Sequence, residues 1–448
     1  PKTYSNIKVK IRGREVKKLG LEAAVKELTK AKKIIDEGTY VVPSIIVDVA
    51  KWGKRITEKL KEDPDVRELY DENVAVYIGT WEVKCPNTLC GKYTPLVGNW
   101  WLAKVKGKKY AYMKPKIKGT KVDIEIVKGK TSGAPAPNVR GRPELAQCLL
   151  CGSKITYIDT KTGRTYGSKK ETPQLIRNRL EFYPKHAIKE WNRRLEEYLE
   201  GRISLEELKK AKARPRLLVK VKIVGKDLKF GSCSEEDNER LWKALEKLKQ
   251  IWRDPDIPTE QVPEYENRRI TPILGAKYWY QFFNLRQLLT LVKLVKLIRE
   301  AGKKIEEEKL RESWSREDAF KYAEAVTTYL TMALLRYVNF GNYSNTWNPG
   351  SWAISKVRGG GVFATRGLSM TWNWVDISPL KDPMYSWEGC IQTQIEAISY
   401  LVSAVSGSSS KVRVLLDDAT VLSKLGDEKF GVIVTDPPYR DDVPYTEL

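Results

Sequence analysis

The expected fold is decided by two apolar runs, VRVLLDD at 412–418 and FGVIVTDPPY at 430–439, in a chain of 448 residues. Each run leads directly into acidic side chains, and an amphipathic helical pattern at 389–405 precedes both. Helix, strand, short helix and strand in this order, with strands apolar on both faces, is typical of a parallel sheet covered by helices. The pattern therefore predicts an α/β fold, with ligands bound where the acidic clusters end the strands.

The rest of the chain predicts a large mixed insertion of helices and strands. Helices are expected at 13–38 with Gly38 as the stop, from Ser44 onward, and at 187–212, 235–251 and 316–338. A further helix is expected from Asn284, with Gly302 just past its end. Strands are expected at 73–83, within 97–127 and at 216–224, with an exposed basic loop at 128–143, irregular chain at 153–182 and a long loop at 339–380.

The charge of the chain is strongly positive. Lysine and arginine number 80 against 57 acidic residues, which gives a formal net charge of +23. A surplus of this size suits binding to a polyanion, although solubility or a Lys/Glu-rich surface of the kind found in heat-adapted proteins would also explain it. A single histidine, His186, excludes a His-rich metal centre. The absence of a signal sequence or apolar span predicts a cytoplasmic protein.

The tetrapeptide Asp436-Pro437-Pro438-Tyr439 carries the sharpest chemical signal. Each proline fixes its backbone and removes an N–H donor, so the loop after the strand is stiff. The Asp436 carboxylate and a neighbouring carbonyl would accept both hydrogens of an exocyclic amino group, and Tyr439 would stack on an extruded base. A Pro-Pro turn that merely ends a strand is the structural alternative.

Several segments together resemble a known family. They are DPPYRDDVPYTEL at 436–448, VRVLLDDAT at 412–420, KYWYQFFNLRQL at 277–288, CPNTLCGKYTPLVGNWWLA at 85–103 and WGKR at 52–55. The chain is similar to a large, poorly characterised prokaryotic family of S-adenosylmethionine-dependent DNA amino-methyltransferases, some of them linked to defence loci. Arg440 stands where that family would place an aromatic residue.

This resemblance implies a partial Rossmann-like class I methyltransferase fold. It implies methyl transfer from S-adenosylmethionine to adenine N6 or cytosine N4 in DNA, with Asp436, Pro437, Pro438 and Tyr439 as the catalytic residues. It also implies that Asp418, or its neighbour Asp417, binds the adenine amino group of the cofactor. The partners would be DNA and possible restriction–modification or defence proteins. An RNA amino-methyltransferase and a non-catalytic zinc-bearing nucleic-acid-binding protein remain the alternatives.

The Gly-rich cofactor loop that the resemblance requires is not found in the sequence. The segment most similar to it is Phe340-Gly341-Asn342-Tyr343. We therefore expect a fragment truncated at both ends and inactive alone, although a complete chain with permuted motifs is the alternative. The expected units are a helical segment at 1–72 adjoining the missing cofactor half, a β-rich zinc-knuckle insertion at 73–182, a mostly helical target-recognition region at 183–380, and the second half of the methyltransferase sheet at 381–448.

Four cysteines are spaced as two close pairs, Cys85 with Cys90 and Cys148 with Cys151. Two such pairs can supply four thiolates to a tetrahedral zinc ion, and a closed set of four sulfur ligands is structural, not catalytic. Buried free thiols or two local disulfides are the alternatives. The isolated Cys233 and Cys390 are expected to be small buried apolar groups.

Aromatic residues accompany the basic residues in two places. Lysines at 104–118 alternate with Trp100, Trp101, Tyr110 and Tyr112, as in a surface that tracks phosphates, although a solvated strand face explains them equally well. Tryptophans 347, 352, 372 and 374 could line a base pocket, but tryptophan at this density is more often core.

Overall fold

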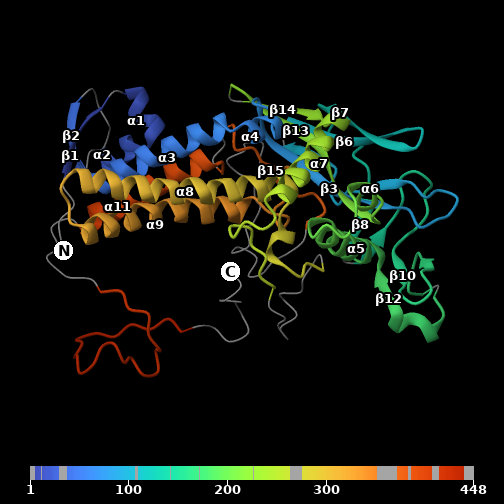
Figure 1. The fold of residues 1–448 in the computed structure, drawn as a ribbon. Coiled ribbons are helices and arrows are strands. Elements are labelled where there is room, and N and C mark those ends of the chain that lie inside the picture. Colours follow the sequence, from blue (N-terminus) through green and yellow to red (C-terminus); the bar gives the residue numbers. More distant parts are fainter. Residues whose placement is uncertain are drawn as a thin grey trace.

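The structure is a computed structural model of the chain. It describes residues 6–11, 13–29, 38–105, 109–141, 143–170, 172–225, 227–262, 275–350, 371–381, 385–405 and 413–437. Long helices occupy one end of the molecule and β-structure the other (Figure 1).

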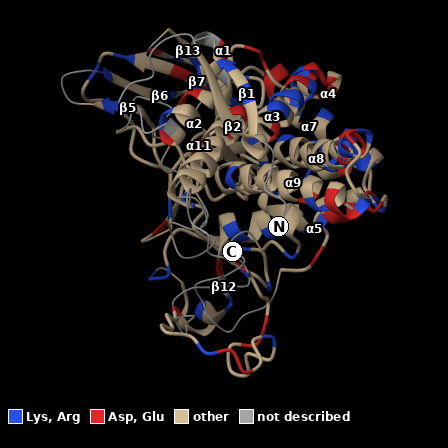
Figure 2. Ribbon diagram, turned by 90° about the vertical axis from the view of Figure 1, so that its left-hand side faces the viewer, with Lys and Arg blue, Asp and Glu red and all other residues tan. Residues whose placement is uncertain are grey.

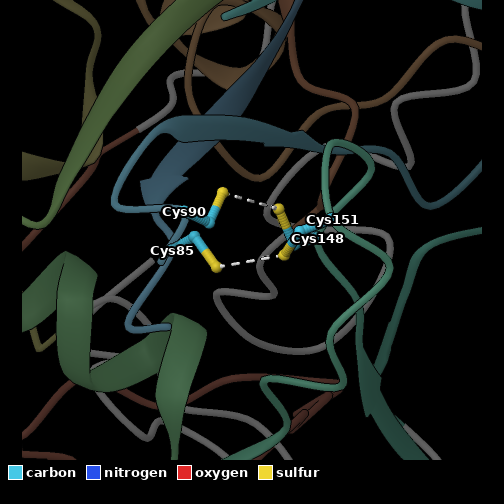
Figure 3. Close-up of side chains that lie close together, drawn as sticks. All are labelled: Cys85, Cys90, Cys148 and Cys151. Carbon is cyan, nitrogen blue, oxygen red and sulfur yellow. Dashed lines mark hydrogen bonds between the residues drawn. The ribbon is translucent and has the colours of Figure 1, made fainter. Parts of the chain in front are cut away.

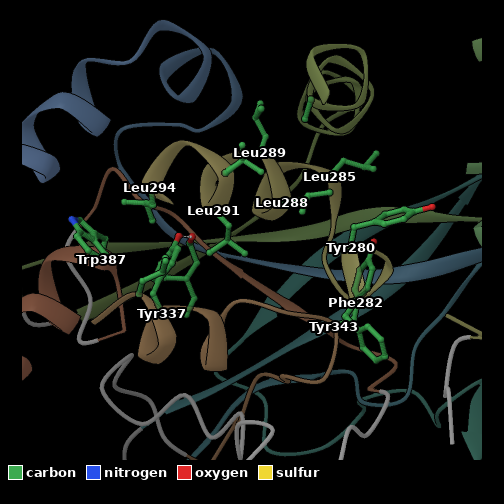
Figure 4. Packing of buried hydrophobic residues seen from close by; sticks show 14 of the residues in the cluster. Tyr280, Phe282, Leu285, Leu288, Leu289, Leu291, Leu294, Tyr337, Tyr343 and Trp387 are labelled. Atoms are coloured by element: carbon green, nitrogen blue, oxygen red, sulfur yellow. Dashed lines mark hydrogen bonds between the residues drawn. The ribbon is translucent and has the colours of Figure 1, made fainter. Parts of the chain in front are cut away.

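Four long helices form the bundle: α3 (Ser44–Glu62), α8 (Leu285–Arg311), α9 (Arg316–Phe340) and α11 (Trp387–Val405). Leucines recur along α8 at helical spacing; of these, Leu291 lies toward Tyr337 of α9 and Leu294 toward Trp387 of α11 (Figure 4). Burial of these side chains holds the bundle together, since removing apolar area from water stabilises by about 25 cal/mol per Å². The short helices α1 (Gly13–Leu19) and α2 (Leu21–Thr29) and the hairpin of β1 (Asn6–Ile11) with β2 (Gly38–Pro43) close its far end.

The central sheet is antiparallel and has the order β14-β13-β3-β15, with β4 paired to β3. Its strands are β3 (Val74–Lys84), β4 (Tyr93–Leu96), β13 (Ala213–Val224), β14 (Asp227–Ser232) and β15 (Val375–Ile377). Ten of the eleven residues of β3 are buried, because this strand is covered on both faces. The glycine at position 79 lets the ring of Trp374 pack directly on the β3 backbone.

Smaller β-elements surround this sheet. A three-stranded sheet contains β5 (Trp101–Val105), β6 (Lys109–Lys118) and β7 (Lys121–Lys128), and β8 (Val139–Gly141) pairs with β9 (Glu144–Ala146). A third group contains β10 (Tyr157–Asp159), β11 (Thr165–Tyr166) and β12 (Leu180–Phe182). The helices α4 (Pro64–Leu69), α5 (Tyr183–Leu199), α6 (Leu205–Lys209) and α7 (Glu235–Gln250) lie among the strands.

The mixed α/β composition is as predicted, but the expected parallel sheet is not observed. All strand pairs of the described residues are antiparallel, and residues 413–437 form turns and extended chain without a strand. Val432, Ile433 and Val434 are 80%, 76% and 88% exposed. An apolar run becomes a strand only when neighbouring strands accept its backbone hydrogen bonds, and among the described residues these segments have no such partner.

Three local predictions were also wrong. The helix expected at 13–38 breaks at Gly20, which has a φ of 70°, and Gly38 begins a strand instead of ending a helix. Gly302 lies inside α8, where a Cβ atom would approach Thr327 of α9 to 3.0 Å. The segment expected to be irregular at 153–182 contains three short strands. The central sheet pairs β3 with β13, which lie on either side of position 182 in the sequence.

Candidate metal centre

The four predicted cysteines meet at one point, where the turn between β3 and β4 faces the turn that follows β9 (Figure 3). The Sγ atoms of Cys85 and Cys151 lie 3.8 Å apart, and those of Cys90 and Cys148 lie 4.0 Å apart. All four sulfur atoms are within 4.8 Å of one another. A tetrahedral zinc ion with Zn–S bonds of about 2.3 Å separates its ligands by roughly 3.8 Å, so the described cluster has the dimensions of such a site.

Backbone hydrogen bonds shape both turns. In the first turn, the carbonyl of Asn87 accepts from the N–H groups of Cys90 and Gly91, each at 2.9 Å. In the second, Cys148 donates from its N–H to Ser153 and accepts from Gly152 at its carbonyl, each at 3.0 Å. Gly91 and Gly152 have φ values of 57° and 72°, a region that favours glycine, and so each turn can fold back just after its second cysteine.

Contacts among the cysteines shift their pKa values in opposite directions. A side-chain hydrogen bond from Cys85 lowers the pKa of Cys148, and the same contact raises the pKa of Cys85. Four adjacent thiols cannot all ionise without a compensating cation, and a divalent metal supplies that charge. Because Cys85 and Cys148 are buried and four thiolates fill a tetrahedral shell, the site can hold a structural metal with no open position. Cys390 is buried elsewhere, as expected, whereas Cys233 is only partly buried against the core.

The predicted catalytic tetrapeptide lies far from the cysteines in the sequence and is only partly described. Asp436 and Pro437 are exposed, at the end of the segment 413–437, which contains no strand. Pro438, Tyr439 and the neighbouring Arg440 lie outside the described residues.

The two candidate cofactor-binding acids, Asp417 and Asp418, shape a local turn. The carboxylate of Asp417 accepts from the Ser423 hydroxyl at 2.9 Å and from the Lys424 N–H at 2.6 Å. Asp418 accepts from the N–H and hydroxyl of Thr420 at 2.8 and 2.7 Å. These bonds lower the pKa of both carboxyl groups. In this conformation both carboxylates accept hydrogen bonds from residues of the same turn.

In the basic and aromatic stretch, Tyr110, Tyr112, Lys114 and Lys116 alternate along β6 and so lie on one face of the β5-β6-β7 sheet. Trp101 and Tyr112 are cross-strand partners with ring centroids 5.4 Å apart, and the Lys104 ammonium lies 5.1 Å from the Trp101 ring. Lys114 and Lys116 extend this face and are exposed. In Figure 2, blue segments mark β5 and β6, whereas acidic and basic residues alternate over α3 and α4.

The tryptophans of the long loop belong to the core where they are described. Trp374 is completely buried, and the Trp347 indole N–H donates to the Leu102 carbonyl at 2.7 Å. Trp372 is half-buried against the core, and Trp352 lies outside the described residues. The core alternative is therefore confirmed for Trp347 and Trp374.

Comparisons with protein-family models, curated proteins and solved structures find no match to this chain. No helix in the described part of the chain has the length and apolarity needed to cross a membrane. Functional conclusions therefore rest on the residues and their geometry.

Proposed function

We propose that the chain is part of an S-adenosylmethionine-dependent amino-methyltransferase that acts on DNA, with a structural zinc ion at the four cysteines. The observation that carries the proposal is Asp436-Pro437-Pro438-Tyr439 directly after the run FGVIVT. Its apolar side chains at 432–434 are 76–88% exposed. Because exposed apolar surface is unfavourable in water, this supports a role in which the segment is covered as a strand in the assembled enzyme.

The proposed chemistry assigns a separate role to each residue. The Asp436 carboxylate and the following carbonyl accept hydrogen bonds from the target amino group and orient its nitrogen. Their attraction strengthens as positive charge develops on that nitrogen, so it lowers the barrier to methyl transfer. Pro437 and Pro438 hold these acceptors in place, and Tyr439 stacks on the extruded base. S-adenosylmethionine would supply the methyl group.

Asp436→Ala in the full-length gene product tests the proposal. Methyl transfer from labelled S-adenosylmethionine is measured on matched DNA and RNA substrates. We expect Asp436→Ala to reduce turnover on DNA by about 10²–10³-fold, by analogy with the loss of one preorganised group at a site of developing charge. Asp427→Ala, which removes an exposed carboxylate from the same segment, should leave turnover unchanged. Near-normal turnover of Asp436→Ala would refute the catalytic role, and methylation of RNA alone would favour the RNA enzyme.

A second candidate is a zinc-bearing nucleic-acid-binding protein without catalytic activity. The compact cysteine cluster and the net charge of +23 favour it, since neither feature requires a cofactor. Calorimetric titration of the full-length product with S-adenosylmethionine separates the candidates. Saturable binding supports the methyltransferase, whereas salt-sensitive DNA binding without any cofactor binding supports the second candidate.

A further inference from the structure

A strongly basic lobe follows the second cysteine turn. We define the basic lobe as residues 152–180, which contain β10 and β11, the 3₁₀ helix Gln174–Arg179, and the first residue of β12. The strands β10 and β12 lie at the end of the molecule opposite the β1–β2 hairpin (Figure 1). The sequence pattern at 153–182 gave no indication of this unit.

Six cations of the lobe are exposed, and none of them has an ion pair with another described residue: Lys154, Lys161, Arg164, Lys169, Lys170 and Arg177. The one described acid of the lobe is Asp159, whose side chain is only 1% exposed. Glu171 lies outside the described residues. The described lobe therefore presents its positive charge to solvent without compensation, unlike the helical bundle, where lysines pair with carboxylates.

The Asp159 carboxylate forms its hydrogen bonds with other residues of the basic lobe. Its carboxylate accepts from the Lys161 N–H at 3.0 Å, from the Thr162 hydroxyl at 2.9 Å and from the Arg179 guanidinium at 3.0 Å. The hydrogen bond from the Lys161 N–H is the main reason that the pKa of Asp159 is lowered. The hydrogen bonds to the buried acid thus fix the β10–β11 turn, in which Lys161 and Arg164 are exposed.

Aromatic rings and backbone groups hold several of the cations in place. The Arg164 guanidinium lies 5.6 Å from the centre of the Tyr166 ring, and the Lys169 ammonium lies 5.2 Å from that of Tyr157. The Arg177 Nε donates to the Thr172 carbonyl at 3.2 Å. Cations held in this way lose less conformational entropy when they bind a ligand.

We propose that the basic lobe binds the sugar-phosphate backbone of duplex DNA; the choice of DNA rests on the proposed function. Clustered exposed cations match a regular array of phosphates, and release of counterions supplies the free energy. A membrane surface fits less well, because Leu175, at 88% exposure, is the single large apolar side chain that the described lobe exposes strongly.

The cysteine cluster connects this lobe to the central sheet. Cys151 immediately precedes the lobe, and the Asn87 side-chain amide donates to the Ser153 hydroxyl at 2.9 Å. A metal bound by all four thiolates would hold the first residues of the basic lobe against the turn after β3. Loss of the metal should therefore weaken DNA binding by loosening the lobe.

The test compares two triple variants of the intact chain in fluorescence-anisotropy titrations with a short labelled duplex. The lobe variant is Lys154→Gln, Lys161→Gln and Lys170→Gln. The control variant is Lys8→Gln, Lys10→Gln and Lys26→Gln, which removes the same charge from exposed lysines at the opposite end of the molecule. We expect the lobe variant to lose about tenfold or more in affinity and to reduce the slope of log K against log salt by about 2–3, whereas the control should change less than about twofold.

Equal losses in the two variants would overturn the lobe proposal, because net charge alone would then explain binding. Unchanged affinity of the lobe variant, or binding to anionic phosphatidylserine vesicles but not to DNA, would also overturn it. Cys151→Ser provides an independent test of the link between the metal site and the basic lobe. We expect this substitution to lower both the metal content and the DNA affinity of the chain. Full metal content with wild-type affinity would refute that link. The lobe proposal can fail while Asp436→Ala still reduces methylation, so the two proposals are tested separately.

Discussion

Arg286 and Asp376 form an ion pair in which both side chains are completely buried, with the Nη2 and Oδ2 atoms 2.6 Å apart. Arg286 lies in the first turn of α8 and Asp376 at the centre of β15, so the pair joins the helical bundle to the central sheet. The same guanidinium donates to the Leu69 carbonyl at 2.9 Å and lies against the rings of Tyr70 and Tyr77. Tyr70 donates from its hydroxyl to the second oxygen of Asp376 at 3.3 Å.

Asp376→Asn should strongly destabilise the protein. The substitution leaves the Arg286 charge buried without its counter-ion, and breaking a buried pair in this way typically costs about 3–5 kcal/mol. Urea unfolding followed by circular dichroism measures the loss. Glu72→Gln is the matched control, because the Arg67–Glu72 pair is exposed and should contribute less than about 1 kcal/mol. Similar effects of the two substitutions would contradict the proposed role of the buried pair.

Gly79→Ala should be destabilising by at least about 1–3 kcal/mol, because the core would be overpacked. A Cβ atom at this position would lie 2.2 Å from the ring of Trp374, which is completely buried and cannot move aside freely. Gly231→Ala in β14 is the control, since its added Cβ would meet no atom within 4 Å. Thermal unfolding of both variants compares them directly, and an equal shift in Tm would argue against the close packing of Trp374 on β3.

The intact chain should bind one zinc ion, and Cys148→Ser should abolish stoichiometric binding. A buried hydroxyl is a poor substitute for the thiolate, and the remaining three ligands leave the tetrahedral shell open. Elemental analysis measures the metal content, and Cys233→Ala controls for the loss of a cysteine outside the cluster. Zinc affinity should also fall as the pH decreases, because the thiolates bind protons in competition with the metal. A zinc-free wild-type protein after purification without chelator would refute the site.

Acid should remove a contribution to stability that comes from Glu181. The hydrogen bond from His186, together with Lys189, lowers the pKa of Glu181 from 4.5 to about 2. A carboxyl group with a depressed pKa in the folded state stabilises the protein above its unfolded pKa, and this contribution is lost as the pH falls from about 4.5 toward 2. We expect about 1 kcal/mol, because the pair is partly solvated.

Denaturant unfolding at a series of pH values measures this dependence for wild type and for Glu181→Gln. The variant should be less stable at neutral pH and should converge with wild type near pH 2. A constant difference between the two proteins over the whole range would exclude the titration of Glu181 as its cause.

Helices and caps could be predicted from the sequence because their signals are local. The apolar spacing in α3, α7, α9 and α11 identified these helices, although several ends shifted by one or more residues. Asn284 and Gln287 form a capping box at the start of α8, in which each side chain accepts from the other residue's backbone N–H. The helix that they begin nevertheless continues through Gly302, because contacts with α9 outweigh the low helix propensity of glycine.

The sequence by itself determined which residues could form the metal site, since thiol chemistry and paired spacing are properties of the chain. Only the tertiary structure decided that Cys90 and Cys148, 58 residues apart, would meet. It likewise decided the pairing of β3 with β15, the burial of Arg286 against Asp376 and the presence of an organised basic lobe. The apolar runs at 412–416 and 430–435 show the same limit. Apolarity creates a tendency to form a strand, but a strand exists only where another backbone supplies its hydrogen bonds, and that partner is chosen by the folded chain.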